Sequence, residues 1–334
     1  MTHENVVLTS FPTAAVEEDY ARAAVELEEC LAELPGAVAV YKYGSITAPG
    51  ISDLDRVAVV EGGRAAPDVW PRLSERTRYL VMHTPALVDP RTFARHRWLS
   101  ELGDVELVWG TRVSIEQRPF PEYTEPVLAA EALVVAALKL AKLAVTGRVK
   151  VRSLLCELRN VRTDLRLARL ERHDAPRAWS LADQVDRLRE EWWRLDEADQ
   201  RARVQHLLAL APDAIGEAIN ALGARAIEPQ KPRSLPLRAQ WRNVTVVPGG
   251  PLNGRSAAFR SVVGRSRRLG EARWRWVPRR LSLPPAVISL LAGPSPSQYE
   301  KFRVERDELV RRHAHFVASS PGYSGLSLAS IFVE

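Results

Sequence analysis

The chain of 334 residues contains little cysteine, little lysine and no long apolar run. Its two cysteines, Cys30 and Cys156, lie in apolar helical contexts without the spacing of metal ligands, so they predict reduced core thiols. The most apolar stretch, residues 127–145, is interrupted by charged side chains, which favours a buried helix over a membrane span. Residues 1–5 lack the basic and apolar regions of a signal peptide. We therefore expect a cytoplasmic protein without a membrane partner.

Only six of the 47 basic residues are lysine, so arginine dominates a net charge of +6. An arginine bias of this strength partly reflects the base composition of the genome. The excess of positive charge still favours anionic partners such as nucleotides or nucleic acid. The seven histidines are scattered; His313 and His315 are two apart, which on a helix places them on different faces. With 46% hydrophobic and 26% charged residues, the composition is that of a globular protein of two or three domains.

The most informative stretch is an apolar run, 38–43, that ends in Gly44-Ser45 and is followed by Asp53-Leu54-Asp55 and the apolar run 57–60. Alternation along a strand places the two aspartates on one face, roughly 7 Å apart along the chain. This spacing allows two carboxylates to share a pair of divalent ions about 3.5–4 Å apart. Gly44 allows a phosphate to approach the backbone closely, and Ser45 adds a hydroxyl donor.

This pattern resembles the polymerase-beta-type nucleotidyltransferase superfamily, over about residues 14–110. The resemblance implies that Asp53 and Asp55 bind two Mg²⁺ ions and that Gly44 and Ser45 hold the triphosphate of ATP or another nucleoside triphosphate. An acceptor hydroxyl would then attack the α-phosphorus and pyrophosphate would leave. The alternative from the residues alone is a hairpin-like turn in which Asp-Leu-Asp is an ordinary solvated start of a strand.

The family normally supplies a third carboxylate from a later strand. The next strand that the sequence predicts, 78–84, carries no acid, although His83 could take the equivalent place and would weaken Mg²⁺ binding. The strand predicted at 104–109 carries Glu106, our choice for the third catalytic and metal-binding carboxylate, with Asp104 second and Glu116 third. The competing interpretation of Glu106 is a solvent-facing residue on an edge strand.

Many relatives place a basic residue after the Gly-Ser turn, whereas here residues 46–50 contain none. Lys139 and Lys142 share one face of a predicted helix and are candidates to bind the nucleotide phosphates, as the helical domains of such enzymes do. Arg148, Lys150 and Arg152 could add to this charge. A solvated basic face is the alternative.

Periodicity and turn residues predict an α+β protein: a nucleotidyltransferase-like mixed sheet with helices, a helical bundle and a C-terminal region of mixed structure. We place the catalytic domain at 1–120, the helical domain at 122–226 and the basic C-terminal region at 238–334. Helices are expected at 12–34, 67–75, 90–98, 126–146, 150–172, from Ser180 to 195, 199–222 with a bend near Pro212, and 299–317.

The C-terminal region carries two further signals. Gly249 to Ser256 nearly matches a phosphate-binding loop, but Arg255 replaces the lysine and Pro251 removes a backbone donor, which favours a turn. Eight arginines lie between Arg260 and Arg280, where they form either a solvated strand face or a track for nucleic-acid phosphates.

The function we expect is magnesium-dependent transfer of a nucleoside monophosphate to a hydroxyl of a small molecule, nucleic acid or protein. The alternative is an inactive protein of the same fold that binds nucleotide or RNA, or that serves as an interaction module. An acid of strand 104–109 beside Asp53 and Asp55 would favour catalysis, and His83 there would favour the alternative. The sequence leaves the acceptor, the nucleotide and the oligomeric state open.

Overall fold

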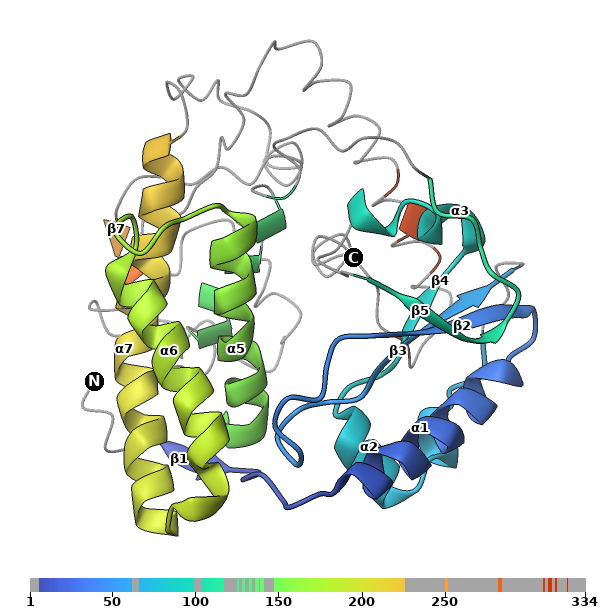
Figure 1. The fold of residues 1–334 in the computed structure, drawn as a ribbon, viewed down its shortest axis with the longest axis horizontal. Helices are drawn as coiled ribbons and strands as arrows, with labels where there is room; N and C mark the ends of the chain where they lie inside the picture. The colour runs from blue at the N-terminus through green and yellow to red at the C-terminus, as the bar shows by residue number, and fades with distance from the viewer. Residues whose placement is uncertain are drawn as a thin grey trace, which may run out of the picture. The chain divides into compact units, whose positions relative to one another are not determined.

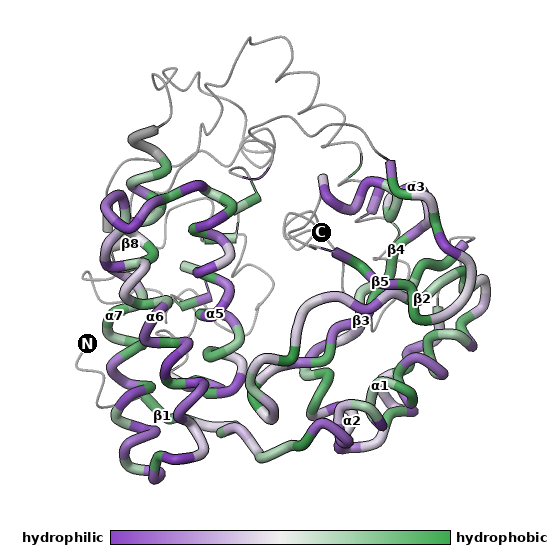
Figure 2. Tube along the Cα trace, viewed as in Figure 1, coloured by the Kyte–Doolittle hydropathy of each residue, from purple (hydrophilic) through white to green (hydrophobic). Residues whose placement is uncertain are grey.

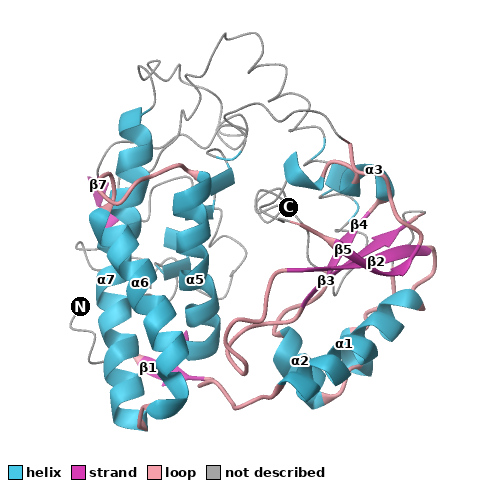
Figure 3. Cartoon of the chain, in the orientation of Figure 1, coloured by secondary structure: helices cyan, strands magenta, loops and turns pink. Residues whose placement is uncertain are grey.

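A computed structural model describes residues 6–61, 66–98, 104–116 and 147–225, the short stretches 250–251 and 282–283, and separate residues between 125 and 140 and between 309 and 323. The chain divides into two compact units. One combines Met1–Phe11 with Tyr123–Tyr299, and the other combines Pro12–Glu122 with Glu300–Glu334. Helices and sheets occur together, so the predicted mixture of α and β structure is confirmed at that level (Figure 3).

The unit formed around residues 12–122 is built on a four-stranded mixed sheet (Figure 1). Its strands, in spatial order, are β4 (Ala86–Val88), β3 (Asp55–Val60), β2 (Ala37–Tyr43) and β5 (Glu106–Gly110). β3 runs parallel to β4, whereas β2 is antiparallel to both of its neighbours. Because β2 and β3 are antiparallel, the end of β2 and the start of β3 lie at the same edge of the sheet.

Apolar side chains on both faces of this sheet are covered. Helices α1 (Glu17–Ala32) and α2 (Glu75–Val81) pack on the face that carries Val40, Ala58 and Val60. Phe93 of α3 (Pro90–Phe93) packs with Tyr41 and Val57 on the other face. The unit also contains two turns of 3₁₀ helix, at Trp70–Arg72 and His96–Trp98. Strands buried on both faces explain the near-continuous apolar runs of the sequence.

The strand predicted at 78–84 is wrong, because residues 75–81 form α2. Ser74 begins the helix: its hydroxyl accepts a hydrogen bond from the amide of Thr77 at 3.2 Å, as N-cap residues do. Thr77, Leu80 and Val81 are buried, and their spacing of three and four residues is that of one helix face. The strand of this region is displaced to β4, three residues long.

In the other unit the structure describes α5 (Val151–Leu167), α6 (Pro176–Glu191) and α7 (Glu197–Arg225) over their whole lengths, and separate helical residues between 125 and 140. α6 contacts both α5 and α7, and hydrophilic and hydrophobic residues alternate along all three (Figure 2). A 3₁₀ turn, Trp192–Arg194, follows α6. The strands β1 (Val7–Thr9) and β6 (Arg148–Lys150) form a parallel pair in the same unit.

The start predicted for α6 at Ser180 is wrong, because the helix begins four residues earlier. Pro176 occupies its first turn, where a proline loses no helical hydrogen bond. The predicted helix at 199–222 is part of α7, which continues through Pro212. Arg162 of α5 ties the helices together, because its guanidinium bonds Asp183 at 2.6 Å and Asp186 at 2.5 Å, both on α6.

Much of the C-terminal region lies outside the described residues. This applies to the arginine-rich segment Arg260–Arg280 and to most of the near match to a phosphate-binding loop, Gly249 to Ser256. The described pieces are β7 (Gly250–Pro251) and β8 (Ser282–Leu283), which pair antiparallel. Among the residues that the structure describes, no helix combines the length and the hydropathy needed to cross a bilayer.

Candidate metal and nucleotide site

Asp53 and Asp55 stand at the edge of the sheet where β3 begins. Asp55 is the first residue of the strand, and Asp53 precedes it by two positions. Their side chains are partly accessible, with 25% of Asp53 and 18% of Asp55 exposed. The two carboxylates therefore lie close together at a surface that a ligand can reach.

The Gly44 turn lies against Asp55. Tyr43 pairs with Asp55 in the β2–β3 register, which brings the next residue, Gly44, beside the aspartate. Gly44 has a φ of +72°, and a Cβ at this position would lie 3.0 Å from Asp55 Oδ2. Its conformation favours glycine, and any larger residue would displace the Asp55 carboxylate. Ser45, which follows, is exposed at the same edge.

His83 is the third member of the cluster. Its Nε2 lies 3.1 Å from Asp55 Oδ1 and 3.7 Å from Asp53 Oδ2. One donor atom from each of the three side chains lies within 4.8 Å of the others, a grouping that could hold a metal ion. The second ring nitrogen, Nδ1, lies 2.9 Å from the carbonyl oxygen of Thr84. This contact fixes the ring so that Nε2 faces the two carboxylates.

A strained turn at Met82 places His83 beside the two aspartates. Met82, which follows α2, has a φ of 66° and a ψ of −41°. The amide of His83 donates to the carbonyl of Val81 at 2.7 Å, so Met82 is the centre of a γ-turn. Turns of this hand are rare for residues other than glycine and are strained. Backbone strain therefore accompanies the third side chain of the cluster.

The two carboxylates change the titration of their neighbours. Burial lowers the pKa of His83, but the hydrogen bond to Asp55, the contact with Thr84 and the charges of both aspartates outweigh it and raise this pKa to about 9. Burial, followed by the charges of Asp55 and Asp53, raises the pKa of Tyr43 well above its ordinary value. Without a metal ion the cluster is thus held together by an imidazolium between two carboxylates.

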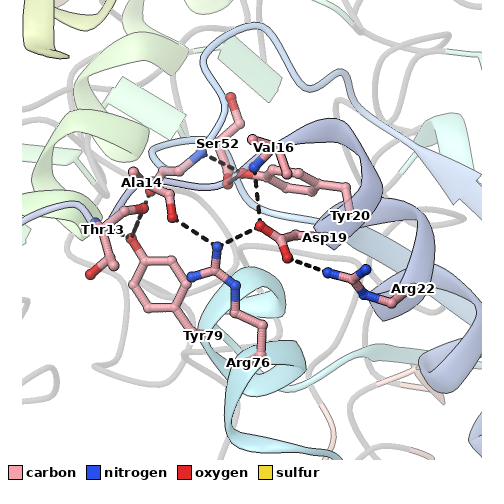
Figure 4. A network of polar contacts seen from close by, with 10 residues as sticks. Thr13, Ala14, Val16, Asp19, Tyr20, Arg22, Ser52, Arg76 and Tyr79 are labelled. Carbon is pink, nitrogen blue, oxygen red and sulfur yellow. Dashed lines mark hydrogen bonds and ion pairs between the residues drawn. The ribbon is translucent and has the colours of Figure 1, made fainter.

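The loop between β2 and β3 is fixed by tyrosine hydroxyls from two helices (Figure 4). Tyr20 of α1 donates to the carbonyl of Ser52 at 2.7 Å and accepts from the amide of Gly50 at 3.0 Å. Tyr79 of α2 donates to the carbonyl of Gly50 at 2.7 Å. The amide of Leu54, between the two aspartates, donates to the carbonyl of Leu80 at 3.0 Å. These bonds hold the backbone that carries both carboxylates.

The structure does not bring Glu106 to the two aspartates. Its carboxylate lies 2.9 Å from Lys42 Nζ, and Lys42 pairs with Glu106 in the register of β2 and β5. A register shift between Val40 and Tyr41 is the cause, because uninterrupted pairing would place Glu106 opposite Tyr43, on the face of Asp55. The shift instead turns Glu106 to the opposite face.

The other acids proposed for the third position also have different partners. Asp104 lies 3.7 Å from Arg97, and Glu116 lies 2.5 Å from Arg95. Leu107 of β5 and Val105, which precedes the strand, pack in the cluster that contains Tyr41, and both are apolar. The described part of this strand therefore supplies no acid to the site.

The predicted phosphate-binding lysines belong to the other unit. Lys139 Nζ lies 2.6 Å from Glu157 Oε2, so this ammonium already has an acidic partner. Lys142 and the Arg260–Arg280 segment lie outside the described residues. Both proposals for binding phosphate remain predictions.

Comparison of the chain with protein-family models, with curated proteins and with solved structures gave no match.

The sequence contained a signal for the placement of His83 that strand prediction overlooked. Ser74 followed by Glu75 is a helix start, and a helix over the next seven residues ends just before His83. Tyr20 and Tyr79, which hold the loop, carried no motif that would have marked them. They are recognised only from their hydrogen bonds in the folded chain.

Proposed function

We propose that this protein is a divalent-metal-dependent nucleotidyltransferase, which moves a nucleoside monophosphate from a nucleoside triphosphate to an acceptor hydroxyl. The observation that carries the proposal is the meeting of Asp53, Asp55 and Gly44 at one edge of the sheet. In this reaction a bond forms between the acceptor oxygen and the α-phosphorus, and the bond from this phosphorus to the pyrophosphate oxygen breaks. The acceptor's proton passes to solvent.

The donor set fits a divalent cation. Two carboxylates and one imidazole nitrogen lie within 4.8 Å of one another, and three protein ligands with open positions are typical of catalytic metal sites. Asp53, Asp55 and His83 would hold the ion, which when bound would neutralise phosphate charge and polarise the phosphorus–oxygen bonds. The raised pKa of His83 supports this fit, because the carboxylates already favour a positive charge at this point.

The Gly44 turn supports the nucleotide part of the proposal. Gly44 has no side chain to cover the backbone of this turn, so phosphate oxygens can come close to its amides. Ser45, which follows it, is exposed, and its side chain carries a hydroxyl that can both donate and accept hydrogen bonds. Both groups are adjacent to the carboxylates, as a metal-bound triphosphate requires.

A second function is favoured by one specific observation. Val105, just before β5, and Leu107 of β5 pack in the cluster that contains Tyr41 and are apolar, and His83 lies in the cluster where an acid would support Mg²⁺ catalysis. Magnesium prefers oxygen ligands, so this arrangement favours nucleotide binding without transfer if Mg²⁺ is the ion. The second candidate is therefore an inactive protein of the same type that binds nucleotide.

The deciding experiment is transfer of label. The protein is incubated with each α-labelled nucleoside triphosphate, with Mg²⁺ and in parallel with Mn²⁺, and with a panel of hydroxyl acceptors. Pyrophosphate release and labelled product are followed for the wild type and for Asp53→Asn and Asp55→Asn. Asp104→Asn is the matched control, because this fully exposed acid lies in the same unit but outside the cluster.

Transfer that is lost in Asp53→Asn and Asp55→Asn but kept in Asp104→Asn would support the enzyme. Nucleotide binding that depends on the same two aspartates, without transfer under either ion, would support the second candidate. Nucleotide binding that is equal in all four proteins would contradict both. Glu106→Gln should leave every measurement unchanged, because Glu106 pairs with Lys42 on the opposite face.

A further inference from the structure

The chemistry of the third ligand selects among metal ions. A nucleotidyltransferase site for Mg²⁺ is built from oxygen ligands, whereas here His83 offers a ring nitrogen 3.1 Å from one carboxylate and 3.7 Å from the other. Magnesium has little affinity for imidazole, but manganese, cobalt and zinc accept a site that mixes nitrogen and carboxylate ligands. The donor set therefore departs from the one that the resemblance implied.

The second ring nitrogen shows that His83 is oriented as a metal ligand is. Metal-bound histidines usually donate their other N–H to a carbonyl or carboxylate, which fixes the tautomer. Nδ1 of His83 has such a partner in the carbonyl of Thr84 at 2.9 Å. In the neutral ring the lone pair of Nε2 then points toward Asp53 and Asp55. A metal ion that displaces the proton of Nε2 would be held by this lone pair and by the two carboxylates.

We infer that Asp53, Asp55 and His83 form a site for one first-row transition-metal ion of the Mn²⁺ class, in preference to a pair of Mg²⁺ ions. This inference concerns the site of the proposed function and deepens it by naming the class of ion. It also has a practical consequence for the transfer assay: with Mg²⁺ alone, an active enzyme would show no nucleotide transfer.

The test uses Mn²⁺ alone, without nucleotide. Metal-stripped full-length protein is titrated with Mn²⁺ near pH 8, and free Mn²⁺ is counted by its electron paramagnetic resonance signal. One equivalent should bind, and displacing it should require at least about a tenfold higher concentration of Mg²⁺ than of Mn²⁺. Spin-echo modulation of the bound ion should then show a directly coordinated ¹⁴N nucleus, which only a nitrogen ligand produces.

Variants at one position test the ligand itself. His83→Asp converts the set to three carboxylates, so the ¹⁴N modulation should vanish and the preference for Mn²⁺ over Mg²⁺ should fall by about tenfold or more. His83→Asn, which keeps a polar side chain of similar size, is the second variant in case the first unfolds. His173→Ala is the matched control, because His173 is exposed and lies 3.8 Å from a single aspartate. It should bind Mn²⁺ as the wild type does.

Three results would overturn the inference: no bound Mn²⁺, bound Mn²⁺ without ¹⁴N modulation, or Mg²⁺ that competes on equal terms. Each of them leaves the proposed function testable, because nucleotide transfer is measured separately. Conversely, a Mn²⁺ site that has the ¹⁴N signature but supports no transfer would retain this inference and remove the catalytic proposal.

Discussion

Replacing Gly44 by alanine should damage the fold and the site by two separate effects. The first is conformational: a residue other than glycine at a φ of +72° costs roughly 1–2 kcal/mol. The second is local, because the new Cβ would lie 3.0 Å from Asp55 Oδ2 and the carboxylate would have to move by a few tenths of an ångström. Only the second effect should change metal binding.

Gly147 separates the two effects. It also has a positive φ, +62°, but a Cβ built there meets no heavy atom within 4 Å in the described part of the chain. Gly147→Ala should therefore carry the conformational cost without touching a carboxylate. For a domain of this size, a loss of about 1–2 kcal/mol corresponds to a fall in Tm of roughly 2–8 °C in either variant.

Thermal melting and Mn²⁺ titration of the two variants give the comparison. Both should melt earlier by similar amounts, while only Gly44→Ala should bind Mn²⁺ more weakly, by about tenfold or more, as disturbed metal ligands typically do. Equal Mn²⁺ affinity in Gly44→Ala and wild type would refute the placement of Gly44 against a metal-binding Asp55. Equal weakening in Gly147→Ala would show that the loss follows stability alone.

Three further outcomes are expected. Tyr20→Phe removes two hydrogen bonds from a buried loop and should lower the free energy of unfolding by about 1–3 kcal/mol, measured by urea denaturation. Tyr79→Phe should lower it less, because Tyr79 is more accessible. Equal losses would contradict the role of Tyr20 in joining Gly50 to Ser52. The hydrogen bond from Arg172, with help from Arg162, lowers the pKa of Asp183 to about 2, although burial opposes this shift. The ionised Asp183 therefore stabilises the fold above pH 3.8, and this stabilisation is lost as the pH falls toward 2. Between pH 5 and 2 the Tm should fall more steeply in the wild type than in Asp183→Asn. In metal-free protein the pKa of His83 is raised from 6.5 to about 9, so the charged imidazolium stabilises the fold fully below pH 6.5. This stabilisation is lost as the pH rises to 9. A Tm profile that is the same in wild type and His83→Ala between pH 6.5 and 9 would contradict the contact between His83 and Asp55.

The sequence predicted the part of the site that depends on neighbouring residues. A strand that ends just before Gly44 and a strand that begins at Asp55 are separated by one loop, so antiparallel pairing brings Gly44 and Asp55 together without further information. The two aspartates share a face for the same reason. These features follow from chain connectivity and from the period of a strand.

The third ligand could not be predicted in this way, because it depends on long-range register. Whether Glu106 faces Asp55 is decided by one register shift between Val40 and Tyr41, which has no clear local signal in the sequence. His83 reaches the cluster only because residues 75–81 form a helix and Met82 turns back after it. The strand-like composition of residues 78–82 concealed the helix.

The hydrogen bond from the Leu54 amide to the Leu80 carbonyl has a mechanical consequence. Leu54 separates the two aspartates, and Leu80 lies in the last turn of α2, three residues before His83. The three donors are therefore linked through backbone and do not adjust one by one. A displacement of α2 would therefore carry the aspartate segment along with His83. The position of the three proposed metal ligands is thus coupled to the position of a single short helix.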